Sequence, residues 1–383
     1  MYNPNTTTSM QGNKEVMLSD FLVQQPPTDS ISSIKYSPMS DILTACSWDG
    51  SVYIYMPTNP SVHESMALKT SIPNPNGSPI LCSCFSNDGM YLFTGSADGV
   101  VRAVDMGTGN LSELGRHSLA VSSMVFTSAR TLVTGSWDKT VKVWNINNPQ
   151  APPKEILMEE KVCGMDSKMS TITILLSNNI VSYDVYTLEK IQVPTNSAYQ
   201  NKLRPGSSMG YGTIQTASKY QLKSLWQLRS VSCSNDGQDA IVGTTGSKAE
   251  IVAVRPGNGL STLYYSFRCK QNSSDRNAYP INSVHYHPAF PMTLLTAGTD
   301  GVVMLWNRQA KCRVAIGGPG ATATSSGIDK CITATAFNST GRYLAVAVGY
   351  DWSQGFKSQI PTPVEIRILM IPEEIHAKTG MRI

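Results

Sequence analysis

One short pattern recurs along the chain and constrains its fold more than any other feature. In residues 131–145 (TLVTGSWDKTVKVWN), an apolar run that ends in Gly-Ser is followed by a polar turn and then by alternating apolar and polar residues. Alternation with a period of two is typical of a strand with one buried face. Two such strands joined by a tight turn that contains Asp form a β-hairpin. The segment therefore predicts a hairpin.

The same pattern occurs three more times, in residues 42–55, 91–105 and 293–307. Asp-Gly occupies the turn in each of these copies, where glycine accepts the positive φ that a tight hairpin requires. The interval is 49 residues from Asp49 to Asp98 and 40 residues from Asp98 to Asp138. A hairpin that recurs about every 40–50 residues resembles the WD-repeat family, whose fold is a β-propeller.

The length of the chain limits the number of blades. Its 383 residues allow seven blades of about 40–50 residues with loops to spare. We therefore predict an all-β, seven-bladed WD-repeat β-propeller that forms a single domain over residues 14–383, after a polar tail at 1–13 that we expect to be disordered. Residues 14–23 are expected to close the ring. The expected blades span residues 29–56, 79–106, 119–146, 161–185, 226–254, 279–307 and 330–370, the fourth and fifth having the weakest pattern.

Composition argues against a secreted or membrane-spanning chain. No run of 18 apolar residues exists, so we expect no membrane span. Residues 1–14 are polar and do not resemble a secretory leader, so we expect the eight cysteines to be reduced thiols. The net charge of +4 is too small to indicate nucleic-acid binding by itself.

No group of residues indicates an active site. His285 and His287 would share one face of a strand, but zinc takes three or four ligands, so we interpret both as structural. The glycine-rich residues 317–320 contain a proline and do not lead into a helix, unlike a phosphate-binding loop. We predict no catalytic residue, no metal and no cofactor, and hence no enzyme. A propeller enzyme whose residues converge from separate loops is the less favoured alternative.

One segment combines positive charge with aromatic residues. Residues 190–235 contain six basic residues and no acidic one, and three tyrosines and Trp226 lie between them. Such a segment can hold a phosphate backbone and stack bases, or it can dock an acidic peptide. A solvated loop with a few buried aromatics explains it equally well.

Three other segments resemble the mRNA export factor family of WD-repeat proteins. They are GYDWSQG at 349–355, SFRCK at 266–270 followed by AYPIN at 278–282 and HYHP at 285–288, and PPTDSIS at 26–32. The resemblance implies a non-catalytic adaptor of the nucleus and nuclear pore, found also in the cytoplasm, that binds an acidic nucleoporin peptide and single-stranded RNA. The alternative is the sister family at the kinetochore, whose partners are spindle-checkpoint kinases and microtubule-associated proteins.

The resemblance also implies a set of partner-binding residues. Carried over position by position, these are Phe267, Arg268, Trp306, Arg308, Lys311, Lys223 and Arg229. Trp306 fits equally well as a core residue that closes its hairpin. Two departures indicate a divergent member. Glu250 stands where the family has a basic residue, with Lys248 as the candidate replacement, and the loop at 192–222 is longer than the family's.

Overall fold

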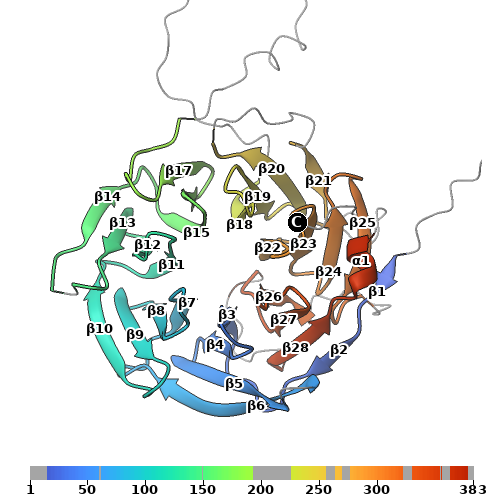
Figure 1. The fold of residues 1–383 in the computed structure, drawn as a ribbon, viewed down its shortest axis with the longest axis horizontal. Helices are drawn as coiled ribbons and strands as arrows, with labels where there is room; N and C mark the ends of the chain where they lie inside the picture. Colours follow the sequence, from blue (N-terminus) through green and yellow to red (C-terminus); the bar gives the residue numbers. More distant parts are fainter. Residues whose placement is uncertain are drawn as a thin grey trace, which may run out of the picture.

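Seven β-sheets stand around a common axis like the blades of a propeller (Figure 1). The computed structural model describes residues 15–59, 62–148, 150–192, 226–255, 264–269, 277–321, 330–353, 355 and 363–377. The prediction of an all-β, seven-bladed propeller is confirmed. The tail expected at 1–13 and the loop at 193–222 lie outside the described residues.

The first four blades follow one another in chain order. Blade 1 consists of β3 (Ile31–Tyr36), β4 (Leu43–Ser47), β5 (Ser51–Asn59) and β6 (Val62–Pro73). Blade 2 consists of β7 (Ile80–Phe85), β8 (Tyr91–Ser96), β9 (Val100–Asp105) and β10 (Leu111–Arg116). Blade 3 consists of β11 (Val121–Phe126), β12 (Leu132–Ser136), β13 (Thr140–Trp144) and β14 (Lys154–Leu157). Blade 4 has three strands among the described residues: β15 (Val162–Lys168), β16 (Thr171–Leu176) and β17 (Ile180–Asp184).

Three blades complete the ring. Blade 5 consists of β18 (Leu228–Cys233), β19 (Asp239–Thr244), β20 (Lys248–Ala253) and β21 (Ser266–Arg268). Blade 6 contains β22 (Ser283–Tyr286), β23 (Thr293–Ala297), β24 (Val303–Asn307) and β25 (Cys312–Gly317). Blade 7 contains β26 (Ile332–Phe337), β27 (Tyr343–Val348) and β28 (Glu365–Met370), and the helix α1 (Glu373–Ala377) follows it.

All four predicted hairpins are present, and their turns have the expected geometry. They correspond to β4–β5, β8–β9, β12–β13 and β23–β24. Gly50, Gly99 and Gly301 have φ between 73° and 84° in their turns. Lys139, at the equivalent position in blade 3, has a φ of 67°. Glycine is preferred there because an L side chain crowds the backbone at positive φ.

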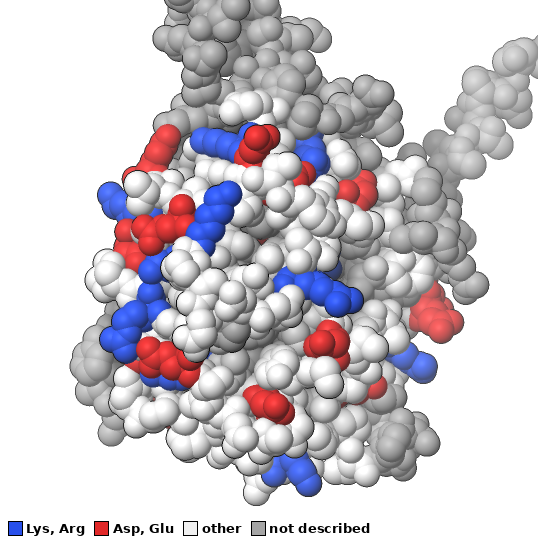
Figure 2. Space-filling view, turned by 60° about the vertical axis from the view of Figure 1, so that its left-hand side comes forward, with Lys and Arg blue, Asp and Glu red and all other residues white. Residues whose placement is uncertain are grey.

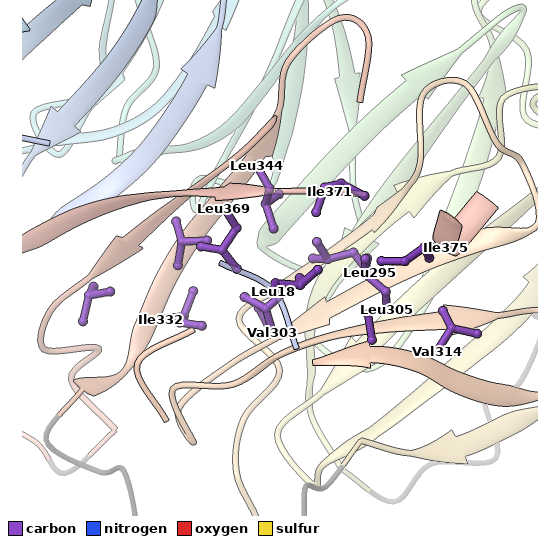
Figure 3. Close-up of a cluster of buried hydrophobic side chains, with 14 residues drawn as sticks. Leu18, Leu295, Val303, Leu305, Val314, Ile332, Leu344, Leu369, Ile371 and Ile375 are labelled. Carbon is purple, nitrogen blue, oxygen red and sulfur yellow. The ribbon is translucent and has the colours of Figure 1, made fainter. Parts of the chain in front are cut away.

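The two ends of the described chain meet between blades 6 and 7. The segment expected to close the ring supplies β1 (Val16–Met17), which pairs parallel with β25, and β2 (Asp20–Leu22), which pairs antiparallel with β28. Leu18, between these strands, packs with Leu295, Leu369 and Ile375 in one buried cluster (Figure 3). Closure removes the free edges that an open array of sheets would expose.

Antiparallel pairing gives the ring two distinct faces. The turns between second and third strands all lie on one side, which we call the hairpin face. The turns between first and second strands lie on the opposite face. First strands line the axis and fourth strands form the rim (Figure 1). None of the helices among the described residues is long and apolar enough to span a membrane.

Candidate functional site

A buried hydrogen-bond network explains the repeated aspartate in blade 3. His117 Nε2 lies 2.8 Å from Thr134 Oγ1, which also accepts a 2.8 Å bond from Trp144 Nε1. His117 Nδ1 lies 3.1 Å from Asp138 Oδ2. Burial alone would raise the pKa of Asp138, but hydrogen bonds from Thr140 and Ser118 hold it at about 2. These groups are all engaged with one another, so their role is structural.

An aromatic cluster lies near the rim between blades 5 and 6. The Phe267 ring of β21 is 4.9 Å from the Trp306 ring of β24 and 5.6 Å from the Tyr265 ring, measured between centroids. Lys311 Nζ lies 4.9 Å from the Tyr265 centroid. All three rings are partly exposed, while Lys311 is exposed. The structure thus brings three of the predicted residues together, and it adds Tyr265, which the sequence comparison did not include.

Trp306 is both a core residue and a surface residue. Its Nε1 donates a 2.9 Å hydrogen bond to Thr296 Oγ1, as Trp144 does to Thr134. The ring also packs with the buried Met304 and Ile316 on one side and with Phe267 on the other. The two interpretations of Trp306 are therefore compatible, because one part of the ring is anchored and another part is accessible.

Arg268 is adjacent to the aromatic cluster in sequence but projects from the other face of the sheet. Lys248 pairs with Arg268, and Glu250 pairs with Ser266, so these four residues share the face opposite Phe267. Arg268 is exposed and Lys248 is half-buried. Glu250 is only 6% exposed, so its carboxylate lies within the protein rather than on the surface that a partner would meet. Two cations therefore lie side by side at this edge of blade 5.

Arg308 belongs to a buried ion pair. Its side chain donates bonds of 2.7 and 3.3 Å to the carboxylate of Asp239, and Tyr286 Oη donates to the same carboxylate. The guanidinium also lies over the Tyr286 ring, and Arg308 is 4% exposed. Arg308 therefore links blade 6 to blade 5, and among the predicted residues that the structure describes it is the least exposed to a partner.

Arg229 lies on the hairpin face, at the mouth of the central channel. Its Nε donates a 3.0 Å hydrogen bond to Asn282 Oδ1, and Asn282 Nδ2 donates one of 3.0 Å to Asp351 Oδ2. Burial alone would raise the pKa of Asp351, but hydrogen bonds from Thr299, Ser353 and Asn282 lower it. This chain of contacts holds the 350–353 turn in place. Lys223, the remaining predicted residue, lies outside the described residues.

Three tryptophans surround the same mouth. The cavity there has a volume of about 340 Å³ and is lined by Trp48, Trp137 and Trp352, together with Lys161 and Arg229. The Trp48 and Trp352 rings are 5.4 Å apart. Sequence reasoning missed this group, although a signal was present. Each tryptophan adjoins the aspartate of a hairpin-face turn, and such turns converge on the axis of a propeller.

The two histidines examined as metal ligands are structural. His285 Nε2 lies 2.9 Å from the Thr335 carbonyl oxygen, and His287 Nε2 lies 3.0 Å from that of Gly341. Burial lowers the pKa of His285 to about 4, which keeps its imidazole neutral. Among the described residues, no three His, Cys, Asp or Glu side chains are grouped as a metal site would require.

Comparison with known families and proteins agrees with the repeat pattern. Residues 21–55, 68–105, 109–145 and 268–307 match the model of the WD domain, G-beta repeat family. Among solved structures, the WD40 repeats of RRP9 superpose with a TM-score of 0.68 at 14% identity, over 92% of this chain and 97% of that one. At this identity the superposition establishes the fold alone.

Several curated proteins are similar over nearly the whole chain. The Poly(A)+ RNA export protein of Schizosaccharomyces pombe is 27% identical, over 98% of this chain and 97% of its own length. The WD40 repeat protein poxJ of Penicillium oxalicum is 29% identical, over 92% and 93% respectively. The mitotic checkpoint protein BUB3.1 of Arabidopsis thaliana is 28% identical, over 90% and 91%.

Proposed function

The chain is a member of the mRNA export factor family of WD-repeat proteins, and from this premise we propose that it is a non-catalytic adaptor in mRNA export through the nuclear pore. It acts in the nucleus and at the nuclear envelope, where it binds an acidic nucleoporin peptide and single-stranded RNA. The observation that carries this proposal is the accessible aromatic and cationic surface formed by Tyr265, Phe267, Trp306 and Lys311.

The chemistry of this surface suits both ligands. Phe267 and Trp306 offer ring faces and edges on which a base or an apolar side chain can stack, and each stacked base contributes roughly 1–3 kcal/mol. Lys311 on one side, and Arg268 with Lys248 on the other, supply charges for carboxylates or phosphates. Because Glu250 is buried, it does not oppose the approach of an acidic chain.

The mouth of the central channel offers a second point of attachment for the same peptide. Lys161 and Arg229 are exposed there beside three tryptophans, so carboxylates and apolar side chains both find partners. An extended peptide that crosses the hairpin face from the Lys248–Arg268 edge of blade 5 to the axis would contact both this edge and the mouth of the channel. Two separated contacts on one peptide raise the affinity. Once the first contact has formed, the second is intramolecular and occurs at a high effective concentration.

Calorimetry with an acidic nucleoporin peptide tests the proposal. We expect micromolar or tighter binding to the wild-type chain, about −8 kcal/mol or better. Arg268→Glu with Lys311→Glu should abolish it. The matched control is Lys69→Glu with Lys154→Glu, which makes the same change of net charge at two exposed residues on other blades and should leave the affinity unchanged. A folded wild-type chain that does not bind the peptide excludes the proposal.

The similarity to a checkpoint protein favours one alternative, a propeller that binds spindle-checkpoint kinase peptides at the kinetochore. Titration with a peptide from such a kinase, in parallel with the nucleoporin peptide, separates the two. The export proposal requires the nucleoporin peptide to bind more tightly, and a fluorescent fusion to concentrate at the nuclear rim in interphase. Tighter binding of the kinase peptide and recruitment to kinetochores would favour the alternative.

A further inference from the structure

A second groove lies between blades 2 and 3, on the side of the ring away from blades 5 and 6. It encloses about 640 Å³, and residues from turns of the opposite face, Met39, Asp88 and Arg130 among them, belong to its lining. Phe93, Leu114, Phe126 and Ile146 line its interior. Pockets of this size accommodate several side chains of a ligand. We call it the blade 2–3 groove.

Apolar side chains continue from the groove to the surface. The Phe93 and Phe126 rings stack 5.6 Å apart at an interplanar angle of 5°, and Tyr91 stacks on Phe93 at 6.3 Å. Tyr91 is 41% exposed, and Met39, across the opening, is 71% exposed. On this side of the molecule, charged side chains gather in small groups that leave broad uncharged areas between them (Figure 2). Exposed apolar side chains such as Tyr91 and Met39, beside a cavity with an apolar lining, are typical of a binding site.

Arg130 supplies a charge at the rim of the groove. Its backbone has a φ of 57°, and its N–H donates to the Thr127 carbonyl oxygen. In three other blades the equivalent turn position is occupied by Gly89, Gly237 or Gly341, each with φ between 68° and 75°. A non-glycine residue in this conformation costs about 1–3 kcal/mol, so blade 3 keeps an arginine where glycine would be more stable.

The Arg130 side chain makes only a weak contact within the protein that could offset this strain, a long-range attraction to the exposed Asp88 carboxylate. Its guanidinium forms no hydrogen bond or ion pair with any residue that the structure describes. Hydrogen bonds from Ser86 Oγ and the Met90 N–H are the main causes that lower the pKa of Asp88, and the charge of Arg130 lowers it less. A residue that breaks a local rule without an internal compensation is a candidate for function.

The corresponding space between blades 5 and 6 is filled by the protein itself. Tyr91 and Asp239 are each the first residue of the second strand of their blade. Ile146 and Arg308 each follow the tryptophan of the third strand by two residues. Between blades 5 and 6 the Asp239–Arg308 ion pair and Tyr286 occupy this region. The junction between blades 5 and 6 therefore lacks the opening that blades 2 and 3 leave.

We propose that the blade 2–3 groove binds a short extended peptide of a partner protein. An aromatic or leucine side chain of the peptide enters between Phe93, Phe126 and Leu114, and a neighbouring carboxylate of the peptide pairs with Arg130. The apolar lining selects the anchor, and the exposed guanidinium, which donates no hydrogen bond to a described residue, selects the acidic neighbour. This site is independent of the surface on blades 5 and 6.

The experiment uses a phage-displayed library of random 12-residue peptides and the full chain. The library is first depleted on a Ser112→Trp variant, in which the indole occupies the groove, and is then selected on the wild-type chain. We expect the retained peptides to share an aromatic residue or leucine next to Asp or Glu, and to bind with a Kd of about 10 μM or lower. If no retained peptide binds more tightly than about 100 μM, the proposal fails.

Arg130→Gly separates binding from folding. Because glycine relieves the strained backbone, Tm should stay unchanged or rise, while affinity for the selected peptide falls about tenfold through loss of the charged hydrogen bond. Arg130→Lys should keep part of the affinity. Lys311→Glu should have no effect on this peptide, which distinguishes the groove from the proposed nucleoporin site. Unchanged affinity in Arg130→Gly would overturn the assignment of the acidic neighbour.

Discussion

Blades 3 and 6 each have a tryptophan at the same position of the third strand. Blade 2 covers the tryptophan of blade 3, whereas blade 5 leaves that of blade 6 accessible. Trp144 and Trp306 both donate their indole N–H to a threonine of the neighbouring strand. Trp144 is only 7% exposed, whereas Trp306 is half-buried. The intrablade framework is therefore the same, and the difference arises from the outer strand of the blade before.

A single position in that outer strand accounts for the difference. Gly115 pairs with Val101 in blade 2, and Phe267 pairs with Ala249 in blade 5, which is the same register position. A Cβ on Gly115 would lie 2.7 Å from the Trp144 ring, so only glycine allows this strand to cover the indole. Phe267 instead meets Trp306 with its own ring and leaves both partly exposed. At this position the junction between blades 2 and 3 is closed, whereas the junction between blades 5 and 6 presents an aromatic surface.

Nearer the opposite face the two junctions exchange these roles. Blades 2 and 3 leave a groove between Phe93, Phe126 and Ile146, whereas Arg308 and Asp239 close the corresponding region between blades 5 and 6. The repeat thus provides a common scaffold, and substitutions at two register positions decide which end of a junction can receive a ligand.

Removing the ion pair should have the largest effect. Arg308→Ala leaves Asp239 buried without its partner, which we expect to lower the free energy of unfolding by about 3–5 kcal/mol in urea titrations. The double variant Asp239→Tyr with Arg308→Ile introduces the residues of blades 2 and 3 at these positions and should lose less. A loss below about 1 kcal/mol in Arg308→Ala would show that the pair does not hold this junction closed.

The next largest effect is expected at the closed indole. Gly115→Ala places a methyl group against the Trp144 ring and should destabilise the chain by about 1–3 kcal/mol, measured by the same titration. Gly109→Ala is a suitable control, because a Cβ there meets no atom within 4 Å although its φ of 75° is also positive. If the two variants are equally destabilised, backbone conformation and not the indole contact decides the cost.

Phe267→Gly makes blade 5 resemble blade 2 and should act on binding more than on stability. Loss of one stacking ring is worth roughly 1–3 kcal/mol, so the affinity for a uridine oligonucleotide should fall about tenfold or more in fluorescence anisotropy. Phe267→Trp should retain binding, since it preserves the ring. Equal affinities for wild type and Phe267→Gly would remove the aromatic cluster from the proposed RNA surface.

The smallest effect concerns the pH dependence of stability. Of the two junctions compared, only the one between blades 2 and 3 has a histidine, His117, in the hydrogen-bond network around its tryptophan. Burial lowers the pKa of His117 below its usual 6.5, so the unfolded chain binds more protons as pH falls below that value, and stability decreases. Cys269, at the same place before blade 6, has a pKa raised to about 12 by burial and stays protonated. His117→Gln should therefore reduce the loss of unfolding free energy between pH 7 and about pH 5. Cys269→Ser should not, and an unchanged slope in His117→Gln would contradict this account.

The sequence was sufficient for the features that depend on local chemistry. Alternating strands and Asp-Gly turns revealed the hairpins, and their spacing revealed the ring, since each blade is one local unit. Phe267, Trp306 and Lys311 were predicted as partner-binding residues through family resemblance, and the structure places them near one another around Tyr265. These residues come from blades 5 and 6, which follow each other in the chain. Neighbouring blades in the sequence are also neighbours in the ring, so their proximity follows from the repeat order.

Features that depend on contacts between blades could not be predicted in this way. Arg308 looked like a surface cation because its partner Asp239 lies 69 residues earlier. Arg268 follows Phe267 directly, yet the pleat directs the two side chains to opposite faces of the sheet. The role of Gly115 becomes visible only when Trp144 of the next blade is placed beneath it.

The pairing of β1 and β2 with blades 6 and 7 also sets the order of events during synthesis. Asp20 forms its ion pair with Arg367, which is 347 residues further along the chain. β1 and β2 therefore wait unpaired until β25 and β28 have been translated. Blades 1 to 5 can pair locally as they emerge, but the circle is completed last, when β1 and β2 meet blades 6 and 7. A premature stop before β28 would leave a row of stacked sheets with both end faces uncovered.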